Sequence, residues 1–593
     1  MKTITMDVAI IGAGGAGLRA ALEIAQQHPN LKIALISKVY PMRSHTVAAE
    51  GGAAAVTQET DSLEHHFDDT VSGGDWLCEQ DVVQYFVENA RKELIQLEHW
   101  GCPWSRKEDG SVNVRAFGGM KIERTWFAAD KSGFHLLHTL FQTSLKYPNI
   151  KRFDEHFCLD LIIENETVQG VLLLDIAEGE IKLIQAKSVI MATGGAGRVY
   201  RYNTNGGIVT GDGMAIAYRH GVALRDMEFI QYHPTGLPGS GILMTEGCRG
   251  EGGILMNKNG YRYLQDYGLG PEVPLGQTKN KYMELGPRDK LSQSFWQEQK
   301  KGNVFKGKRG DYIHLDLRHL GEALINERLP FIRELAKAYV GVDPVHEPIP
   351  VRPTVHYTMG GIATNNKTAT SLSGLFAVGE CASVGLHGAN RLGSNSLSEL
   401  VVFGKLAGQE AALYAQEKKH IDIKILEQKA QKIVQRTEDF LHSNGSEKMV
   451  DIRQEMGDTM EEGVGIYRTK PSMQKTIDKL HELKKRYKNI KIEDKSSVFN
   501  TEFLYAIELG HLLDMALAMA YSAINREESR GSHQRIDGFE KRDDKNYLKH
   551  SLAYYQGDDA PEIKYGKVTI TRSQPAQRAY GAAGDKKIKE DIK

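Results

Sequence analysis

Cysteine is scarce in this chain, and no two cysteines stand close enough in sequence to act together. Five cysteines are scattered among 593 residues, with no CxxC pair. This distribution excludes a disulfide framework and a self-contained zinc or iron–sulfur site of usual spacing. We therefore expect no metal site in this chain. The lack of paired cysteines also excludes a dithiol oxidoreductase.

Long apolar runs and an excess of one charge are also missing. No run approaches the roughly 20 apolar residues that span a bilayer, and the start, MKTITMDVAIIGAGGAG, has no signal-peptide cleavage region. The 75 basic and 76 acidic side chains leave a formal charge of −1, which gives no global attraction to nucleic acid or anionic membranes. We therefore expect a cytoplasmic chain with no nucleic-acid partner, unless another protein carries it elsewhere. Its length predicts three or four structural units.

A glycine-rich turn near the N-terminus carries the strongest local signal. MDVAII is typical of a buried strand, and the following GAGGAG places Gly12, Gly14 and Gly17 in GxGxxG register. The pattern then predicts a helix over 18–27 and a second strand over 32–37. In this βαβ setting the glycines allow close backbone approach, and the helix N-terminus offers free N–H groups to a pyrophosphate. The unit predicts dinucleotide binding.

The end of the second strand favours FAD over NAD. An NAD-binding unit carries an acidic residue about 20 residues after the glycines, whereas Ser37 and Lys38 stand here. A hydroxyl can still reach a ribose oxygen. Two later segments, KSVIMATGGAG (187–197) and GLFAVGECA (374–382, with Glu380), are strands that run into glycines. Either could be an ordinary buried strand, but in this order they are typical of flavoproteins with two dinucleotide-binding halves.

The fold class predicted from these segments is α/β, with a discontinuous Rossmann-like FAD-binding domain. We expect that domain at 1–230 and 355–415, interrupted by an α+β capping domain at 231–354. A helical domain at 416–540 follows, with helices over 425–442, 471–488 and 502–526. Residues 541–593 form a C-terminal segment that ends in the polar tail GAAGDKKIKEDIK.

Histidine and arginine recur in glycine-rich stretches of the inserted unit and beyond it. Arginine supplies a permanently charged fork that matches carboxylates, and histidine supplies a donor of variable charge. Any one of these residues could be a surface ion pair or a core histidine. Together, next to a flavin, they predict a pocket for a small polyanion. They occur in QYHPTG (His233), TEGCRGEGG (Thr245, Glu246, Arg249), GPRD (Arg288), HYTMGG (His356) and HGANRLGSNSL (His387, Arg391).

These motifs, with RSHTVAAEGG at 43–52, resemble the succinate dehydrogenase/fumarate reductase flavoprotein family. The resemblance runs from Met6 to about residue 557. Within the family the chain is most similar to the flavoproteins of bacterial quinol:fumarate reductases that carry two small membrane anchors. TGLPGSGILMTEGCRGEGGILMNKNGYRYL and NKYMELGPRDK carry that similarity.

His45, in the loop RSHTVAAEGG, could be a surface polar residue, a backbone hydrogen bonder, a metal ligand or a covalent anchor. The metal-ligand interpretation fails because no partner ligands lie at suitable spacing. In the family that the chain resembles, the histidine of R-S-H-T bonds to the flavin 8α-methyl carbon. The resemblance therefore implies covalent FAD at His45, and such a bond raises the potential of the flavin toward that of the succinate/fumarate couple.

The resemblance also implies the reaction, which is reduction of fumarate to succinate in anaerobic respiration. A hydride would pass from the FAD to one olefinic carbon, and a proton would reach the other. The carboxylates of the substrate would be held by His233, Thr245, His356 and Arg391. The proton would come from Arg288, relayed through Glu246 and Arg249, with His233 also in the catalytic set. Cys248 is a candidate for inactivation by thiol reagents, or else an inert buried thiol.

The positions that match the family's FAD contacts complete the expected site. They are Gly12, Ala13, Gly14, Gly15, Ala16, Ser37, Lys38, Ser44, His45, Thr46, Ala49, Glu50, Gly51, Gly52, Ala192, Thr193, Gly194, Asp212, Glu380, Arg391, Ser396 and Leu397.

Electrons must reach this flavin from another protein, because the chain has no cysteine spacing for clusters and no second fingerprint suited to NAD. The resemblance implies an iron–sulfur subunit and two small membrane-anchor subunits that bind menaquinone. We therefore expect a peripheral protein at the cytoplasmic face of the bacterial inner membrane.

Three alternatives stay open. Succinate dehydrogenase shares the site chemistry and runs in the opposite physiological direction. L-Aspartate oxidase has a similar fold but binds FAD without a covalent bond, so His45 disfavours it. A non-catalytic FAD-binding scaffold would be expected to lack His233, Arg249, Arg288, His356 and Arg391, all of which are present.

Overall fold

The predicted βαβ unit is present in the computed structural model, which describes residues 1–578. It consists of β2 (Val8–Ile11), α1 (Gly15–Gln27) and β3 (Ile33–Ser37). A parallel five-stranded sheet in the order β18-β11-β2-β3-β7 is built around it. The other strands are β7 (Ile150–Asp154), β11 (Ser188–Met191) and β18 (Leu375–Ala377), of which β7 and β18 form the edges. Both later segments predicted as strands therefore join the first unit, which confirms the α/β fold class.

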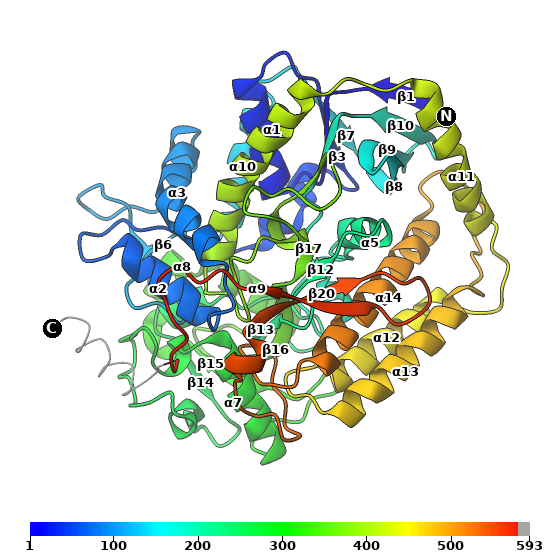
Figure 1. The fold of residues 1–593 in the computed structure, drawn as a ribbon. Coiled ribbons are helices and arrows are strands. Elements are labelled where there is room, and N and C mark those ends of the chain that lie inside the picture. The colour runs from blue at the N-terminus through cyan, green and yellow to red at the C-terminus, as the bar shows by residue number, and fades with distance from the viewer. Residues whose placement is uncertain (579–593) are drawn as a thin grey trace.

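Packing at the first turn explains its glycines. Gly12 has a φ of +115°, and a Cβ there would lie 2.1 Å from the carbonyl oxygen of Ala192. A Cβ on Gly17 would lie 1.8 Å from the carbonyl oxygen of Gly12. The turn and the start of α1 therefore pack too closely for any side chain at these two positions. Helix α10 (Asn395–Glu417) lies along α1 and covers the same face of the sheet (Figure 1).

Two smaller sheets and three helices complete the N-terminal part. The first sheet has the order β1-β10-β9-β8, and the second has the order β4-β6-β5. Their strands are β1 (Lys2–Thr5), β8 (His156–Glu164), β9 (Thr167–Asp175) and β10 (Ile181–Gln185), then β4 (Ala53–Ala54), β5 (Val114–Arg115) and β6 (Thr125–Trp126). The helices are α2 (Leu63–Gly73), α3 (Gln80–His99) and α4 (Ser132–Ser144).

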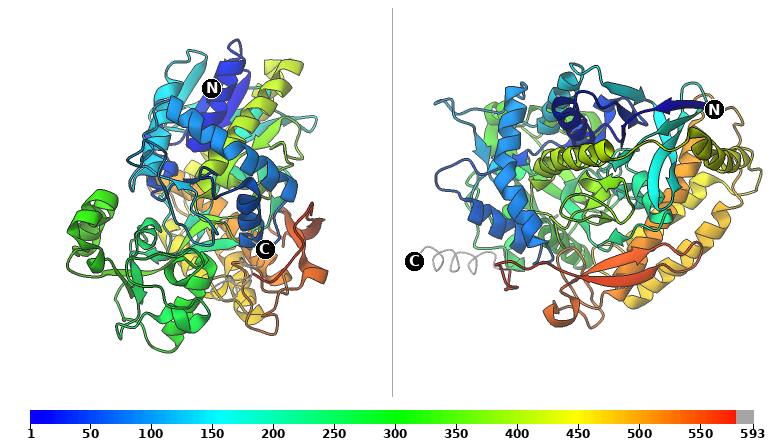
Figure 2. Two further views of the ribbon diagram at one scale, coloured as in Figure 1. Left: turned by 90° about the vertical axis from the view of Figure 1, so that its left-hand side faces the viewer. Right: turned by 45° about the horizontal axis from the view of Figure 1, so that its top comes forward.

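The region predicted as the capping domain contains its own sheet and apolar core. The sheet has the order β13-β16-β15-β14, and the core includes Leu255, Leu291, Leu315 and Ile332. Its entry strand β13 pairs antiparallel with its exit strand β16. The elements are β13 (Ile230–Gly236), α6 (Gly247–Gly250), β14 (Ile254–Met256), α7 (Arg288–Lys300), β15 (Ile313–Asp316), α8 (Gly321–Arg328), α9 (Pro330–Val340) and β16 (Ile349–Thr358). Figure 2 shows this green region extending from the FAD-binding part.

The helical region contains four helices, one more than the sequence pattern predicted. The predicted helices are α11 (Ile423–Leu441), α13 (Lys470–Tyr487) and α14 (Thr501–Asn525), and α12 (Met449–Gly463) was missed. The expectation that no apolar stretch approaches membrane-spanning length was wrong for α14, which is long and apolar enough to cross a membrane by length and composition alone. However, 89% of the most apolar 18-residue stretch of this helix is buried inside the protein, as in a core helix.

The C-terminal segment has more order than its polar composition suggested. β20 (Lys549–Tyr554) and β21 (Glu562–Lys567) form a hairpin that joins a sheet with β12 (Leu224–Arg225), β17 (Gly361–Ala363) and β19 (Ala382–Ser383). The chain then passes the N-terminus of α3, where Gln80 hydrogen-bonds to Thr569, Thr571, Arg572 and Ser573. The tail predicted to fray, 581–593, lies outside the described residues.

Candidate active site

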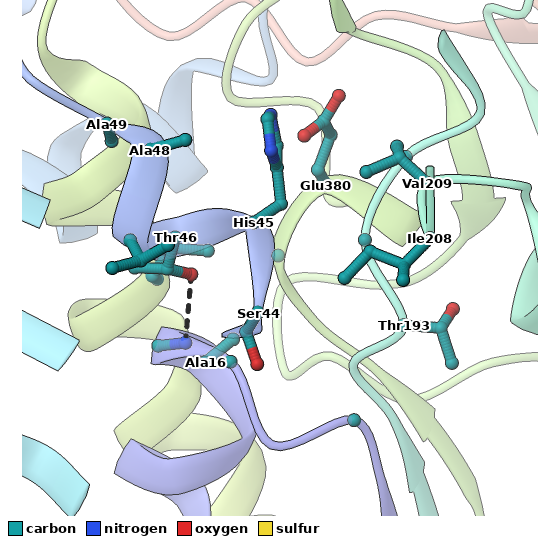
Figure 3. A pocket seen from close by; sticks show the side chains of 18 of the residues that line it. Ala16, Ser44, His45, Thr46, Ala48, Ala49, Thr193, Ile208, Val209 and Glu380 are labelled. Atoms are coloured by element: carbon teal, nitrogen blue, oxygen red, sulfur yellow. Dashed lines mark hydrogen bonds between the residues drawn. The ribbon is translucent and has the colours of Figure 1, made fainter. Parts of the chain in front are cut away.

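A single large cavity of about 640 Å³ collects most of the residues predicted to bind FAD. It lies at the carboxyl ends of the parallel strands, where open α/β sheets bind their ligands. Figure 3 shows its walls around His45, Thr193 and Glu380. The predicted residues that line it are Gly12, Ala13, Gly14, Gly15, Ala16, Ser37, Lys38, Ser44, His45, Thr46, Ala49, Glu50, Ala192, Thr193, Gly194, Asp212, Glu380, Arg391, Ser396 and Leu397.

Gly51 and Gly52 are the predicted FAD residues that do not line this cavity. A Cβ on Gly51 would lie 2.7 Å from the ring of Phe117. Gly52 has a φ of +130°, and a Cβ there would lie 2.2 Å from the carbonyl oxygen of Trp126. Close packing, against a side-chain ring at Gly51 and against backbone at Gly52, therefore accounts for glycine at both positions.

His45 stands on a short 3₁₀ turn, His45–Ala48, directly opposite the glycine-rich turn. Its neighbour Thr46 accepts a hydrogen bond from the N–H of Gly15 at 3.1 Å (Figure 3), which fixes the two turns to each other. The imidazole has one long contact, 3.4 Å from Nδ1 to the N–H of Gly206. Burial lowers the pKa of His45 to about 4, so the ring is neutral at pH 7 and keeps a lone pair for a covalent bond.

The end of the cavity next to β3, where dinucleotide-binding folds hold the ribose, contains two predicted residues and three that the sequence did not indicate. Lys38 donates to Asp212 at 2.6 Å and to Thr210 at 2.8 Å, and both carboxylate and ammonium line the cavity. Phe157 and its neighbours His156 and Cys158 line it as well. They belong to β8, whose sequence has no glycine or charge signature, so only the fold places it here.

His233 and His356 face each other from the paired strands β13 and β16, with ring centroids 5.1 Å apart. His233 Nδ1 lies 3.2 Å from the hydroxyl of Thr235, and its buried Nε2 has no hydrogen-bond partner. His356 Nδ1 lies 2.8 Å from the hydroxyl of Thr204. Burial, reinforced by nearby Arg288, lowers the pKa of both histidines. They are therefore neutral donors with one nitrogen each available to a ligand.

Arg391 is the permanent charge next to these histidines. It is 3% exposed, its Nη1 donates to Ser396 at 2.9 Å, and its Nε has no partner. Its guanidinium lies 4.4 Å from the ring centroid of Tyr357, whose hydroxyl donates to Glu399 at 2.7 Å. Burial and nearby Arg288 lower the pKa of Arg391 to about 10. The group stays cationic at pH 7 and has an unsatisfied donor in the cavity wall.

Arg288, Glu246 and Arg249 form a buried row. The Nε and Nη2 of Arg288 lie 2.7 and 2.6 Å from Glu246 Oε2, and the N–H of Gly118 donates to Oε1 at 2.5 Å. Arg249 Nη2 lies 3.7 Å from the same Oε2. Burial raises the pKa of Glu246, but the two guanidinium groups outweigh it and hold that pKa below its ordinary value. Glu246 is therefore a carboxylate between two cations.

Gln231 connects Arg288 with Arg391, and it was not among the predicted site residues. Its Oε1 accepts from Arg288 Nη1 at 3.0 Å, and its Nε2 donates to the carbonyl of Arg391 at 2.7 Å. It lies two residues before His233 on β13, so both side chains point to the same face of the strand. The spacing of two residues from His233 could have identified Gln231 as a site residue from the sequence.

Thr245 and Cys248 are both buried beside this row. The hydroxyl oxygen of Thr245 accepts from the N–H of Gly247 at 3.3 Å, which leaves its own proton free to donate. Burial raises the pKa of Cys248, which disfavours the thiolate that thiol reagents attack. The structure favours the inert interpretation of this cysteine. Among residues 1–578, no three histidine, cysteine or acidic side chains gather in a way that could hold a metal ion.

The cavity fits FAD on the evidence of its own walls. The N-cap of α1 is Gly14, which has no side chain to cap the helix, so the first-turn N–H groups other than that of Gly15, which donates to Thr46, are available to a pyrophosphate. Thr193 has a buried hydroxyl without a partner, and Gly194 has open space where a Cβ would be. The fold and this site together define a flavoprotein built on two dinucleotide-binding halves.

Comparisons with known proteins agree and identify the family. Residues 7–397 match the FAD binding domain family, and residues 453–580 match the fumarate reductase flavoprotein C-terminal family. The chain is 68% identical to the fumarate reductase flavoprotein subunit of Proteus vulgaris, over 100% of this chain and 99% of that one. A mutated quinol fumarate reductase of Escherichia coli is similar in structure, with a TM-score of 0.96 and 66% identity over 98% of this chain and 99% of that one. A quinol-fumarate reductase solved with menaquinol molecules gives a TM-score of 0.95 and 67% identity over 97% and 100%.

The chain therefore belongs to the fumarate reductase flavoprotein family, and its cofactor is FAD. Identity separates it from the first alternative, because a succinate dehydrogenase flavoprotein subunit of Rickettsia bellii is 41% identical over 97% of this chain and 98% of that one.

Proposed function

We propose that this chain is the catalytic flavoprotein subunit of a quinol:fumarate reductase and reduces fumarate to succinate. Its relatives at 66–68% identity over nearly the whole length are fumarate reductase flavoprotein subunits. The observation that carries the proposal is the convergence of His233, His356 and Arg391 beside the FAD cavity. His233 Nε2 and Arg391 Nε are buried donors without partners, and a dicarboxylate supplies the oxygens that they lack.

Four side chains would bind the substrate. His233, His356 and Arg391 are neutral or cationic donors, and Thr245 has a hydroxyl proton to donate. Because these groups are buried and held by second partners, they fix the two carboxylates without reorganisation, which lowers the barrier. Bound FAD supplies the electron pair, and the negative charge that develops on the substrate is stabilised by the same donors.

Arg288 would donate the proton, with Glu246 and Arg249 behind it. An arginine gives up a proton only to a stronger base, which the electron-rich substrate carbon becomes. Glu246, a carboxylate 2.6–2.7 Å away, would take up a proton from the side of Arg249 and pass it to the neutral Arg288. Arg249 lines a crevice of about 10 Å³ beside Glu284 and Val273, enough for about one water. That crevice would be the outer end of the relay.

Partners would complete the electron path. Since a menaquinol-containing quinol-fumarate reductase has a flavoprotein chain of nearly the same structure, we infer an iron–sulfur subunit and two small anchors that bind menaquinone. The chain would associate with the membrane as a peripheral protein through these subunits. The finer proposal is the cytoplasmic face of the bacterial inner membrane. We also propose the capping role for residues 231–354, since Thr245, Glu246, Arg249 and Arg288 all lie there.

The test combines the covalent bond with the reaction. The full chain is co-expressed with its partner subunits, denatured in acid, and run on a gel that is inspected for flavin fluorescence. We expect fluorescence in the wild-type band and none in a His45→Ser band. Reduced-viologen-driven loss of fumarate measures the activity, and aspartate oxidation is assayed in parallel. Free FAD from wild type would overturn the proposed covalent role of His45. Aspartate oxidation faster than fumarate reduction would overturn the proposed reaction in favour of an L-aspartate oxidase.

A further inference from the structure

Helix α14 of the helical region contributes two buried side chains to the wall behind the ribose end of the cavity. Glu508 and His511 are three residues apart and so lie on one face of the helix. They are 4% and 1% exposed. Neither belongs to the FAD-binding sheet, and the reaction proposed above uses neither of them.

Glu508 holds the ammonium of Lys38 from behind. Its Oε1 lies 2.6 Å from Lys38 Nζ, which also donates to Asp212 at 2.6 Å and Thr210 at 2.8 Å. All three donor positions of the ammonium are therefore occupied, and the side chain has one orientation. Lys38 and Asp212 line the cavity, whereas Glu508 does not.

His511 holds Asp212 in the same way. Its Nδ1 lies 3.0 Å from Asp212 Oδ1, and its ring stacks on Phe157 with an interplanar angle of 7°. Phe157 also lines the cavity. Each of the three cavity-lining residues Lys38, Asp212 and Phe157 thus contacts a side chain of α14 directly.

This arrangement is costly for the fold alone. One ammonium faces two buried carboxylates, and Glu508 Oε2 is buried without a hydrogen-bond partner. A buried polar group left unsatisfied destabilises a fold, because it has lost its hydrogen bonds to water. An apolar residue at position 508 would pack α14 without that penalty, so packing does not account for the carboxylate. The orientation of Lys38 does.

We propose that Glu508 and His511 are positioning residues for the adenosine half of FAD, acting through Lys38 and Asp212. Lys38 follows the second strand of the βαβ unit, where dinucleotide-binding folds hold the ribose. FAD binding and the docking of α14 then stabilise each other, because each needs the same arrangement of Lys38. The inference rests on the proposed assignment of Lys38 and Asp212 to the cofactor.

The test uses the full chain with His45→Ser, so that FAD binding is reversible, after extraction of its flavin. Flavin fluorescence gives the Kd of FAD, and calorimetry gives the Kd of ADP, which carries the adenosine half alone. We expect Glu508→Gln to weaken both by the same factor, about tenfold, and Lys38→Met to weaken both at least as much. In the Lys38→Met background, Glu508→Gln should cause no further loss, because its effect passes through Lys38.

Asp514→Asn is the matched control on the same helix. Asp514 is 2% exposed and lies 2.7 Å from Arg219 and 2.8 Å from Lys484, neither of which lines the cavity. We expect the Kd values of FAD and ADP for Asp514→Asn to stay within about twofold of those of the parent chain. Unchanged binding in Glu508→Gln, equal weakening in Asp514→Asn, or weaker FAD with unchanged ADP would each overturn the inference. A parent chain that binds no FAD would instead overturn the proposed function.

Discussion

Replacement of Arg288 by lysine should separate substrate binding from proton delivery. Arg288 places two donors on Glu246, at 2.7 and 2.6 Å, and a third on Gln231 at 3.0 Å. A lysine keeps the charge but has one ammonium, which cannot span Glu246 and Gln231 in the geometry of the fork. His356 and Arg391, the proposed substrate-binding donors, have their own second partners and should stay in place.

The size of the effect follows from these contacts. A positioned general acid contributes about 10²–10⁴ in rate, and one lost preorganised donor costs about 10²–10³. Because the substituted lysine would retain one ion pair with Glu246, we expect Arg288→Lys to lower kcat about 10³-fold, or about 4 kcal/mol in the barrier. The KM for fumarate should change less than about threefold, which corresponds to about 0.7 kcal/mol.

The assay is the initial rate of fumarate reduction by reduced viologen in the assembled complex. Arg124→Lys is the control, because Arg124 also makes a buried fork, at 2.8 and 2.9 Å to Asp61, outside the site. That variant should keep kcat within a few-fold of wild type. Turnover of Arg288→Lys within tenfold of wild type would refute the role of Arg288 as the acid.

Three further predictions test the surroundings of the site. Gln231→Leu should lower kcat about 10–100-fold in the same assay, because Arg288 Nη1 loses its acceptor and such a loss costs about 1–3 kcal/mol; an unchanged kcat would contradict it. Burial raises the pKa of Glu380 to about 7, so its carboxylate destabilises the flavin-free fold above pH 7, and that cost fades as the pH falls toward the ordinary pKa of a glutamate. Glu380→Gln should therefore raise the free energy of unfolding of the flavin-free chain at pH 8, by up to about 3 kcal/mol, and much less at pH 5; a gain independent of pH would argue against this. Gly17→Ala should destabilise the fold by about 3 kcal/mol through overpacking and lower its FAD content, whereas Gly207→Ala, where a Cβ meets open space, should unfold like wild type.

Local patterns were sufficient for the FAD-binding half of the molecule. The glycine register from Gly12 to Gly17 reports a steric requirement between neighbours in sequence, so it can be read without the fold. Strands β2, β11 and β18 are short apolar runs next to glycines, and this local pattern was enough to predict them. Most predicted FAD residues therefore lie around one cavity.

Long-range partners could not be inferred in this way. Gln231 matters because Arg288, 57 positions later, folds back against it. Glu508 lies 470 positions from Lys38, and nothing in the apolar pattern of α14 indicates that contact. The hairpin of β20 and β21 was missed because β21 is largely exposed and has no run of apolar residues. Helix α12 was missed although Ile452, Met456 and Met460 recur every four residues and are buried, which was an available signal.

The pairing of β13 with β16 has a consequence for how such enzymes diversify. Residues 237–348 leave and return at neighbouring points, since Gly236 pairs with Arg352 in the antiparallel ladder. A tight hairpin could close that gap and leave the strand order of the parallel sheet intact. Thr245, Glu246, Arg249 and Arg288 would all be lost with the excursion, while His45 and the dinucleotide turn would remain. The residues proposed for acid chemistry and those proposed for cofactor attachment are thus in separable parts of the chain, and one part could be exchanged for a different chemistry while the other is inherited unchanged.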